Sequence, residues 1–176
     1  MTQQFGNEKK RLAYEAIEEL GLMKDLSEYN PILCGTLPID LALSNSDLDI
    51  ILEVYDLRLF EKQVCHLYST YEGFTLKRTR IRDKPVIKAN FLYKGFEFEL
   101  FGQPQPSHKQ YAYLHMVIED YLMKQIPSLR ERVILLKQQG CKTEPAFCKI
   151  LGLEGDPYEA LIVYGESQGI IRGGTA

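Results

Sequence analysis

The sequence has no long apolar run, no paired cysteine motif and no excess of basic residues. Spanning a bilayer takes about 20 consecutive apolar residues, so no membrane-spanning segment is predicted. The polar N-terminal segment Met1–Arg11 lacks the apolar core of a signal peptide. The four cysteines form no C-x-x-C pair and no histidines stand at zinc-finger spacing, which indicates reduced thiols. These absences predict a cytoplasmic protein with no membrane partner.

The net charge of −3 argues against a general nucleic-acid-binding protein, which normally carries a strong basic excess. It does not exclude a nucleotide substrate, because a divalent metal neutralises phosphates locally. We therefore expect the partners to be a nucleotide and a small-molecule or protein acceptor, and not a polynucleotide.

Residue periodicity divides the chain of 176 residues into two parts. Helical spacing over residues 8–20 and 57–71 is interleaved with patterns typical of strands. The expected strands cover residues 32–34, 47–55, 74–82, 86–93 and 96–101. From Ser107 onward the pattern is helical throughout. The sequence therefore predicts an α+β fold, with an α/β core over residues 1–103 and an all-helical C-terminal part over 104–176 packed on it.

Polar residues indicate where several helices begin. Asp56 is an expected N-cap, and Asp156-Pro157 combines a cap with proline at the first helical position. Ser107 with Gln110 matches a capping box, and Thr143 is a further expected cap.

Two carboxylates, Asp47 and Asp49, open a strongly apolar strand. Side chains alternate along a strand, so both carboxylates point to the same face. Without a cation, two carboxylates this close would repel, and one would take up a proton. Magnesium prefers oxygen ligands and completes its coordination with water and substrate phosphates. The pair therefore predicts a site for Mg²⁺, or for Mn²⁺.

Gly35 and Thr36 follow the preceding short strand. Glycine lets backbone N–H groups approach a phosphate closely, and the threonine hydroxyl can donate to a phosphate oxygen. If the two strands are neighbours, this turn lies beside Asp47 and Asp49. A phosphate binder next to a metal binder is the arrangement that phosphoryl or nucleotidyl transfer needs.

A third carboxylate is expected on the strand Phe96–Phe101, where the phenylalanines face one way and Glu97 and Glu99 the other. Two acids inside an apolar run indicate a wet or metal-bound face. Glu99 is preferred because it lies further from the Lys94-Gly95 turn, and Glu97 remains the alternative. The third acid would bridge metals or act as a general base.

Two further residues are candidates for nucleotide binding, each with an ordinary alternative. Lys88 lies on a strand near the expected cleft and either holds a phosphate or is an exposed strand lysine. His115 shares a helix face with Gln110 and Glu119; it either contacts the nucleotide or acceptor, or pairs with Glu119 four residues on. The basic positions of residues 77–82 either blunt an exposed sheet edge or face a phosphate.

The spacing of Gly35-Thr36, Asp47-Leu48-Asp49 and a distal acidic strand residue resembles the polymerase-β-like nucleotidyltransferase superfamily. The resemblance covers residues 30–103, and the helical half is similar to that of small bacterial branches, including an uncharacterised one with segments like residues 110–116 and 142–147. It implies a nucleotidyltransferase-like mixed sheet flanked by helices. Threonine stands where serine is usual, and glutamate stands where aspartate is commoner.

The resemblance also implies a reaction, in which a nucleoside monophosphate passes from an NTP to a hydroxyl. Asp47, Asp49 and Glu99 would hold two magnesium ions, and Gly35 and Thr36 would bind the triphosphate. The alternatives are a non-catalytic nucleotide-binding or regulatory domain of the same fold, and a metal-dependent phosphohydrolase with water as the acceptor.

Overall fold

The computed structural model describes residues 2–172, with side chains from residue 8 onward. The helices of the N-terminal half are α1 (Thr2–Leu20), α2 (Leu22–Asp25), the 3-10 helix η1 (Ser27–Tyr29) and α3 (Leu57–Tyr68). The strands are β1 (Ile32–Cys34), β2 (Leu48–Glu53), β3 (Thr75–Ile81), β4 (Lys84–Tyr93) and β5 (Phe96–Gln103). The C-terminal half holds η2 (Ser107–Lys109), α4 (Tyr111–Gln125), α5 (Leu129–Gln138), α6 (Thr143–Leu151) and α7 (Pro157–Ser167).

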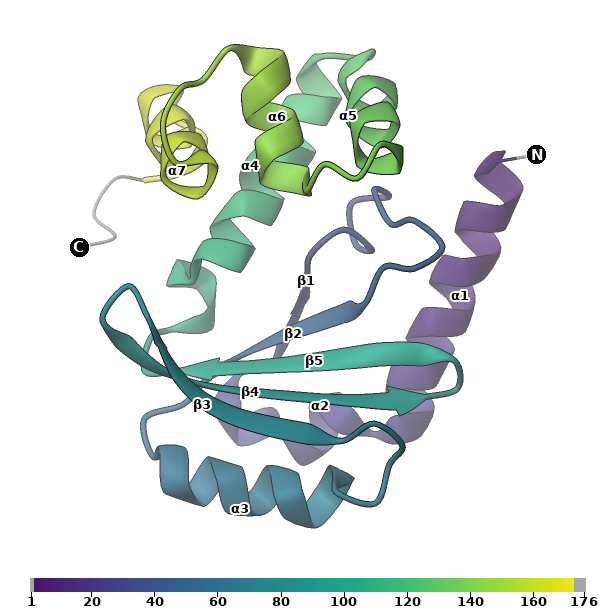
Figure 1. The fold of residues 1–176 in the computed structure, drawn as a ribbon, viewed down its shortest axis with the longest axis vertical. Helices are drawn as coiled ribbons and strands as arrows, with labels where there is room; N and C mark the ends of the chain where they lie inside the picture. The colour runs from purple at the N-terminus through teal and green to yellow at the C-terminus, as the bar shows by residue number, and fades with distance from the viewer. Residues whose placement is uncertain (1, 173–176) are drawn as a thin grey trace.

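The strands form one mixed sheet in the order β1-β2-β5-β4-β3. The central pair, β2 and β5, is parallel, and the other neighbours are antiparallel. In Figure 1, α3 lies below the sheet, α1 lies at one end of it, and α4–α7 gather above it. This arrangement confirms the predicted α+β class, a mixed sheet flanked by helices and followed by a helical C-terminal part.

Two hydrophobic cores account for the two halves. One joins the lower sheet face to α1–α3 and includes Leu48, Ile50, Phe98 and Leu100. The other joins α4–α7 and includes Ile39 and Leu41 of the loop between β1 and β2. Because alternate residues of β2 and β5 enter the first core, the residues between them face the helical half. The loop from Gly35 to Asp47 is thus shared between the halves.

Two of the four expected helix caps are correct. The Asp56 and Asp156 carboxylates each accept two backbone N–H groups at the start of α3 and α7. The capping box at Ser107 is wrong, because the Ser107 hydroxyl donates to the Asn30 carbonyl and α4 begins after Gln110. Thr143 is not a cap either, since it already lies inside α6. In both failures a tertiary position overrides a local signal.

All four cysteines are free thiols. Within residues 2–172, no helix combines the length and apolar character that crossing a membrane requires.

Candidate functional site

A cavity of about 700 Å³ lies between the upper face of the sheet and the helical half. Its sheet side carries the Gly35-Thr36 turn, the end of the β1–β2 loop, and the outward residues of β2 and β5. Its helical side carries one face of α4, the end of α5 and the starts of α6 and α7. The charged residues on its walls are Asp47, Asp49, Arg82, Lys84, Glu99, Glu119, Lys137, Lys142 and Glu144.

The Gly35 turn and the Asp49 carboxylate are in direct contact. β1 and β2 pair antiparallel with Cys34 opposite Asp49, so the residue after Cys34 lies at that carboxylate. Gly35 has a φ of 73°, and a Cβ atom at this position would clash with Asp49 Oδ2. Only glycine satisfies both conditions, since side chains disfavour a left-handed backbone and here there is also no space. Thr36 follows on the cavity wall.

Three carboxylates converge at the same position on the sheet. Asp49 and Glu99 are register partners on the parallel strands β2 and β5, and Asp47 lies immediately before β2. Burial raises the pKa of Asp49 to about 7, and repulsion from Asp47 and then Glu99 contributes to this rise. A buried carboxylate that titrates near neutrality beside two other acids is a group that a cation would stabilise.

The structure distinguishes the two glutamates of β5. Glu97 is exposed and accepts a hydrogen bond from Asn90 Nδ2 at 3.3 Å. Glu99 lines the cavity and forms an ion pair with Lys88 Nζ at 3.0 Å. Lys88 is not among the residues that line the cavity, so its contact with the site runs through Glu99.

Among the described residues, no group of three His, Cys, Asp or Glu side chains is close enough to hold a metal as it stands. The donor set nevertheless fits a divalent cation. Asp47 and Asp49 form no ion pair within the described part of the chain, and the mutual repulsion of the carboxylates shows in the Asp49 pKa. The third acid, Glu99, forms its ion pair with Lys88.

Cationic side chains from both halves hold the loop between β1 and β2. Lys9 Nζ of α1 donates to the Leu43 carbonyl at 2.6 Å. From α5, Arg130 donates to Ile39 O at 2.7 Å and Lys137 Nζ donates to Leu41 O at 2.9 Å. The loop that ends at Asp47 is therefore fixed to α1 and α5 together.

Lys137 is the cation that sequence reasoning missed. It lines the cavity, and burial lowers its pKa while Glu119, Glu144 and the Asp47–Asp49 pair raise it. In the sequence it is an ordinary lysine in the last turn of a helix. Only the packing of α5 over the loop brings it towards the carboxylates, so no local signal identifies it.

The polar face of α4 lines the cavity, as expected for Gln110, His115 and Glu119. These residues are 1%, 4% and 3% exposed. His115 Nε2 lies 2.8 Å from the Tyr158 carbonyl, and its Nδ1 lies 3.6 Å from Glu144 Oε1. His115 therefore contacts α7 and α6, and the pair with Glu119, which was one of its two predicted roles, does not form among the described residues. Glu144, like Lys137, becomes a site residue only through tertiary packing.

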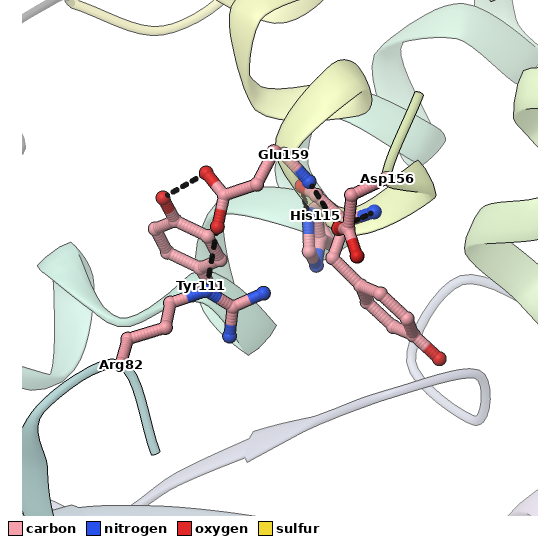
Figure 2. Close-up of polar contacts among 6 residues, drawn as sticks. Arg82, Tyr111, His115, Asp156 and Glu159 are labelled. Atoms are coloured by element: carbon pink, nitrogen blue, oxygen red, sulfur yellow. Dashed lines mark hydrogen bonds and ion pairs between the residues drawn. The ribbon is translucent and has the colours of Figure 1, made fainter. Parts of the chain in front are cut away.

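The tip of the β3–β4 hairpin reaches the helical half at the edge of the cavity (Figure 2). Arg82 Nε donates to Glu159 Oε1 at 2.6 Å, and the Arg82 guanidinium lies 4.3 Å from the centre of the Tyr111 ring. Tyr111 Oη donates to Glu159 Oε2 at 2.7 Å. Arg82 and Asp83 adopt positive φ values of 47° and 60°, which is costly for residues other than glycine. The hairpin thus links the sheet to α7.

Solved structures with similar folds include a poly(U) polymerase and the polymerase core of an RNA surveillance complex. A structure of the Cid1 poly(U) polymerase bound to MgGTP is 20% identical, with a TM-score of 0.51, and the match covers 77% of this chain and 45% of that chain. The polymerase core of TRAMP, an RNA surveillance complex, is 14% identical, with a TM-score of 0.55 and coverage of 88% and 48%. The chain thus spans about half the length of these neighbours. The likeness shows the nucleotidyltransferase fold.

These neighbours contradict our prediction against a polynucleotide partner. The physical reason is that net charge averages over the whole surface. Binding depends on where individual charges lie, and the cations Arg82, Lys84, Lys137 and Lys142 lie on the cavity walls among the acids. A net charge of −3 is therefore no argument about the acceptor.

No curated protein matches the chain. A family model described as a domain of unknown function, DUF4269, matches residues 15–164, which spans the sheet, the cavity and most of the helical half. The chain belongs to the DUF4269 family, and its fold is that of the polymerase-β-like nucleotidyltransferases.

Proposed function

We propose that the protein is a metal-dependent nucleotidyltransferase that moves a nucleoside monophosphate from an NTP to a hydroxyl. The observation that carries this proposal is the contact between the Gly35 turn and Asp49, whose register partner is Glu99. The Gly35-Thr36 turn, two adjacent carboxylates and a third acid share one cavity wall, where the turn would bind phosphate.

The triphosphate would lie along the Gly35-Thr36 turn. There the backbone N–H groups and the Thr36 hydroxyl can donate to phosphate oxygens. Lys137 would supply positive charge from the opposite wall, since it lines the same cavity within electrostatic range of Asp47 and Asp49. The chain thereby brings phosphate donors from the sheet and a cation from α5 to one place.

Asp47, Asp49 and Glu99 would hold the metal, with Mg²⁺ or Mn²⁺ as the expected ion. The bound metal would neutralise phosphate charge and orient the reacting oxygens. Asp49 is suited to this role because its carboxylate is destabilised until a cation arrives. Glu99 would exchange its contact with Lys88 for the metal, or accept the proton of the attacking hydroxyl.

RNA 3′ ends are the first acceptor to test, because the solved structures of similar fold are named as RNA-polymerising enzymes. The chain spans about half of those proteins, so acceptor recognition here would rest on the cavity edge near Arg82 and Lys84.

The test is incubation with each labelled NTP and Mg²⁺ or Mn²⁺, with and without an RNA oligonucleotide that carries a free 3′ hydroxyl. We expect pyrophosphate release and a labelled acceptor, both abolished by Asp49→Asn. Asp120→Asn is the matched control, because Asp120 pairs with Lys124 and does not line the cavity. If neither NTP nor metal binds, the proposal is wrong.

A non-catalytic nucleotide-binding domain is the second candidate, and the Lys88–Glu99 ion pair favours it. If that pair persists when metal and NTP are bound, the third acid is unavailable. NTP binding that depends on Asp49 but releases no pyrophosphate with any acceptor would support this candidate.

A further inference from the structure

The sheet face that bounds the cavity continues past it, across β4 to the edge strand β3. Register partners on neighbouring strands lie side by side, so the outward residues of this face form rows that cross the strands. One row contains the register partners Asp49 and Glu99. The next row begins in the cavity and ends at the sheet edge; from β2 to β3 it contains Ile51, Phe101, Lys88 and Lys77.

The basic residues of β3 face in two directions, and only one direction leads to the cavity. Arg78 lies on the far face, where it pairs with Glu61 of α3. By alternation Arg80 shares that face, and it donates to the Asp83 carbonyl at 2.6 Å. Lys77 lies on the cavity side and is exposed, and among the described residues it forms no ion pair. Its charge therefore has no counterpart in this part of the chain.

The register sets Lys77 directly opposite a second lysine, Lys88. Like charges that face each other across two strands destabilise a sheet. Protection of the sheet edge would need a cation on β3 alone, whereas Lys88 lies on β4, which is paired on both sides. The Lys88 side chain is 34% exposed, and its ammonium has three donors, so its ion pair with Glu99 leaves donors available. The two lysines together indicate an anionic partner that crosses both strands.

Phe101 provides an aromatic surface at the inner end of this row. It is half-buried on the cavity wall, and Lys88 Nζ lies 5.8 Å from the centre of its ring. Glu99 lies two residues before it on β5 and therefore on the same face. Proteins bind single-stranded nucleic acids by combining aromatic rings, on which bases stack, with cations that contact the phosphates. The ring therefore favours a polynucleotide over other polyanions.

On the basis of the nucleotidyltransferase function proposed above, we propose that the Phe101–Lys88–Lys77 row binds a single-stranded polynucleotide acceptor. The terminal base stacks on Phe101, which brings the 3′ hydroxyl beside Glu99. The preceding phosphates contact Lys88 and then Lys77 on the way to the sheet edge. Neighbouring strands are about 4.8 Å apart, so the row spans about 10 Å, which accommodates roughly two or three nucleotides.

The test measures binding of a labelled RNA oligonucleotide with a free 3′ hydroxyl to the full chain, by fluorescence anisotropy in EDTA over a series of salt concentrations. Each phosphate contact to a single strand contributes about 0.7 to the slope of log affinity against log salt. Lys77→Met should therefore make this slope shallower by about 0.7 and weaken binding at low salt. Lys62→Met is the matched control, because it removes an exposed lysine from α3, which lies below the sheet (Figure 1).

Phe101→Leu tests the stacking separately, because it removes the ring and leaves every charge in place. Stacking of one base corresponds to at least about 5-fold in affinity, so RNA binding should weaken by that factor with an unchanged salt slope. A blunt duplex of the same sequence and an oligoglutamate of equal charge are the comparison ligands. Neither offers a free base, so both should bind more weakly than the single strand and should be insensitive to Phe101→Leu.

The proposal is supported if Lys77→Met reduces the salt slope and Phe101→Leu weakens binding of the single strand alone. It is overturned if the RNA does not bind, if Lys62→Met has the same effect as Lys77→Met, or if the duplex or the oligoglutamate binds as tightly. NTP binding with Mg²⁺, measured on the same preparations, tests the transferase function independently. If the RNA binds as expected but no NTP does, the transferase function fails, and the assignment of the RNA as an acceptor fails with it.

Discussion

Gly35 combines two constraints that a substitution would separate. Gly35→Ala introduces a left-handed alanine, which costs about 1–2 kcal/mol, and a Cβ atom that displaces the Asp49 carboxylate. We expect the variant to lose metal and NTP binding as well as stability. Gly95→Ala is the matched control: Gly95 has a φ of 78° but nothing near its missing Cβ atom. Calorimetric titration with Mg²⁺ and ATP, combined with thermal unfolding, compares the two variants. Equal loss of binding in both would contradict the role of the Asp49 contact.

The raised pKa of Asp49 predicts how stability depends on pH without metal. Its pKa moves from the ordinary 3.8 to about 7 in the folded chain, so the folded state holds this proton more tightly. The resulting stability is full below about pH 4 and is lost as the pH rises to 7. At pH 8 the folded chain therefore bears a buried, repelled charge.

Asp49→Asn removes that charge, so in EDTA at pH 8 the variant should unfold at a higher temperature. A gain of ~1 kcal/mol corresponds to about 2–4 °C for a domain of this size. At pH 4 the difference should vanish, because the wild-type carboxyl is then protonated. Scanning calorimetry at both pH values measures this, with Asp120→Asn as the control. With saturating Mg²⁺ the order should reverse, since only the wild type retains the metal ligand.

At the residue scale, alternation along strands was informative. It placed Asp49 with Asp47 on one face of their strand and Glu99 with Glu97 on one face of theirs, and the register of β2 against β5 then made Asp49 and Glu99 neighbours. The Lys88–Glu99 pair, Lys137 and Glu144 could not be predicted in the same way. Their positions depend on which strand lies beside β5 and on how α5 and α6 pack over the loop. Periodicity describes one element and carries no information about its partner.

Among the elements, local capping signals were reliable only where nothing competed for the side chain. Asp56 and Asp156 cap their helices because their carboxylates are free to accept N–H groups. Ser107 has a better partner in the Asn30 carbonyl, so the chain enters η2 before α4 begins. That detour positions Gln110 to donate to Leu52 O at 2.9 Å and Gln105 O at 3.0 Å. The Gln110 side chain, which precedes α4, thus links the helical half to β2.

The β3–β4 hairpin provides a test at the same scale. Glu159→Gln weakens the contact of Arg82 with α7 and leaves the packing of Arg82 on the Tyr111 ring of α4. We expect faster amide hydrogen exchange over residues 80–85. The cost in global stability should be below about 1 kcal/mol, because exposed ion pairs contribute little.

Exchange mass spectrometry measures the effect of Glu159→Gln. Glu15→Gln serves as its control, since it breaks an exposed pair with Arg11 on α1, far along the chain from the hairpin. Unchanged exchange at residues 80–85 in Glu159→Gln would mean that the hairpin holds its position without α7.

For the whole molecule, the sequence indicated two halves but not the space between them. A cavity is a property of how two cores meet, and each core is built from its own apolar periodicity. The loop from Gly35 to Asp47 is the exception, because it contributes Leu37 to one core and Ile39 and Leu41 to the other. A ligand in the cavity would therefore contact both halves and a loop that belongs to each.

Binding of Mg²⁺ with a non-hydrolysable NTP analogue should therefore protect both halves together. At 100 times the dissociation constant, the ligand adds about 2.7 kcal/mol to the free energy of unfolding. We expect slower exchange in the Gly35–Asp47 loop and also in residues 137–145, where Lys137 and Glu144 face the cavity. Protection confined to the loop would mean that the nucleotide contacts the sheet alone.

Lys137→Met tests whether the nucleotide also contacts the helical half, since it removes the cation from α5 but leaves the carboxylates of the sheet unchanged. In that variant the analogue should bind more weakly while Mg²⁺ affinity stays the same or rises, because Lys137 no longer competes with the metal for their charge.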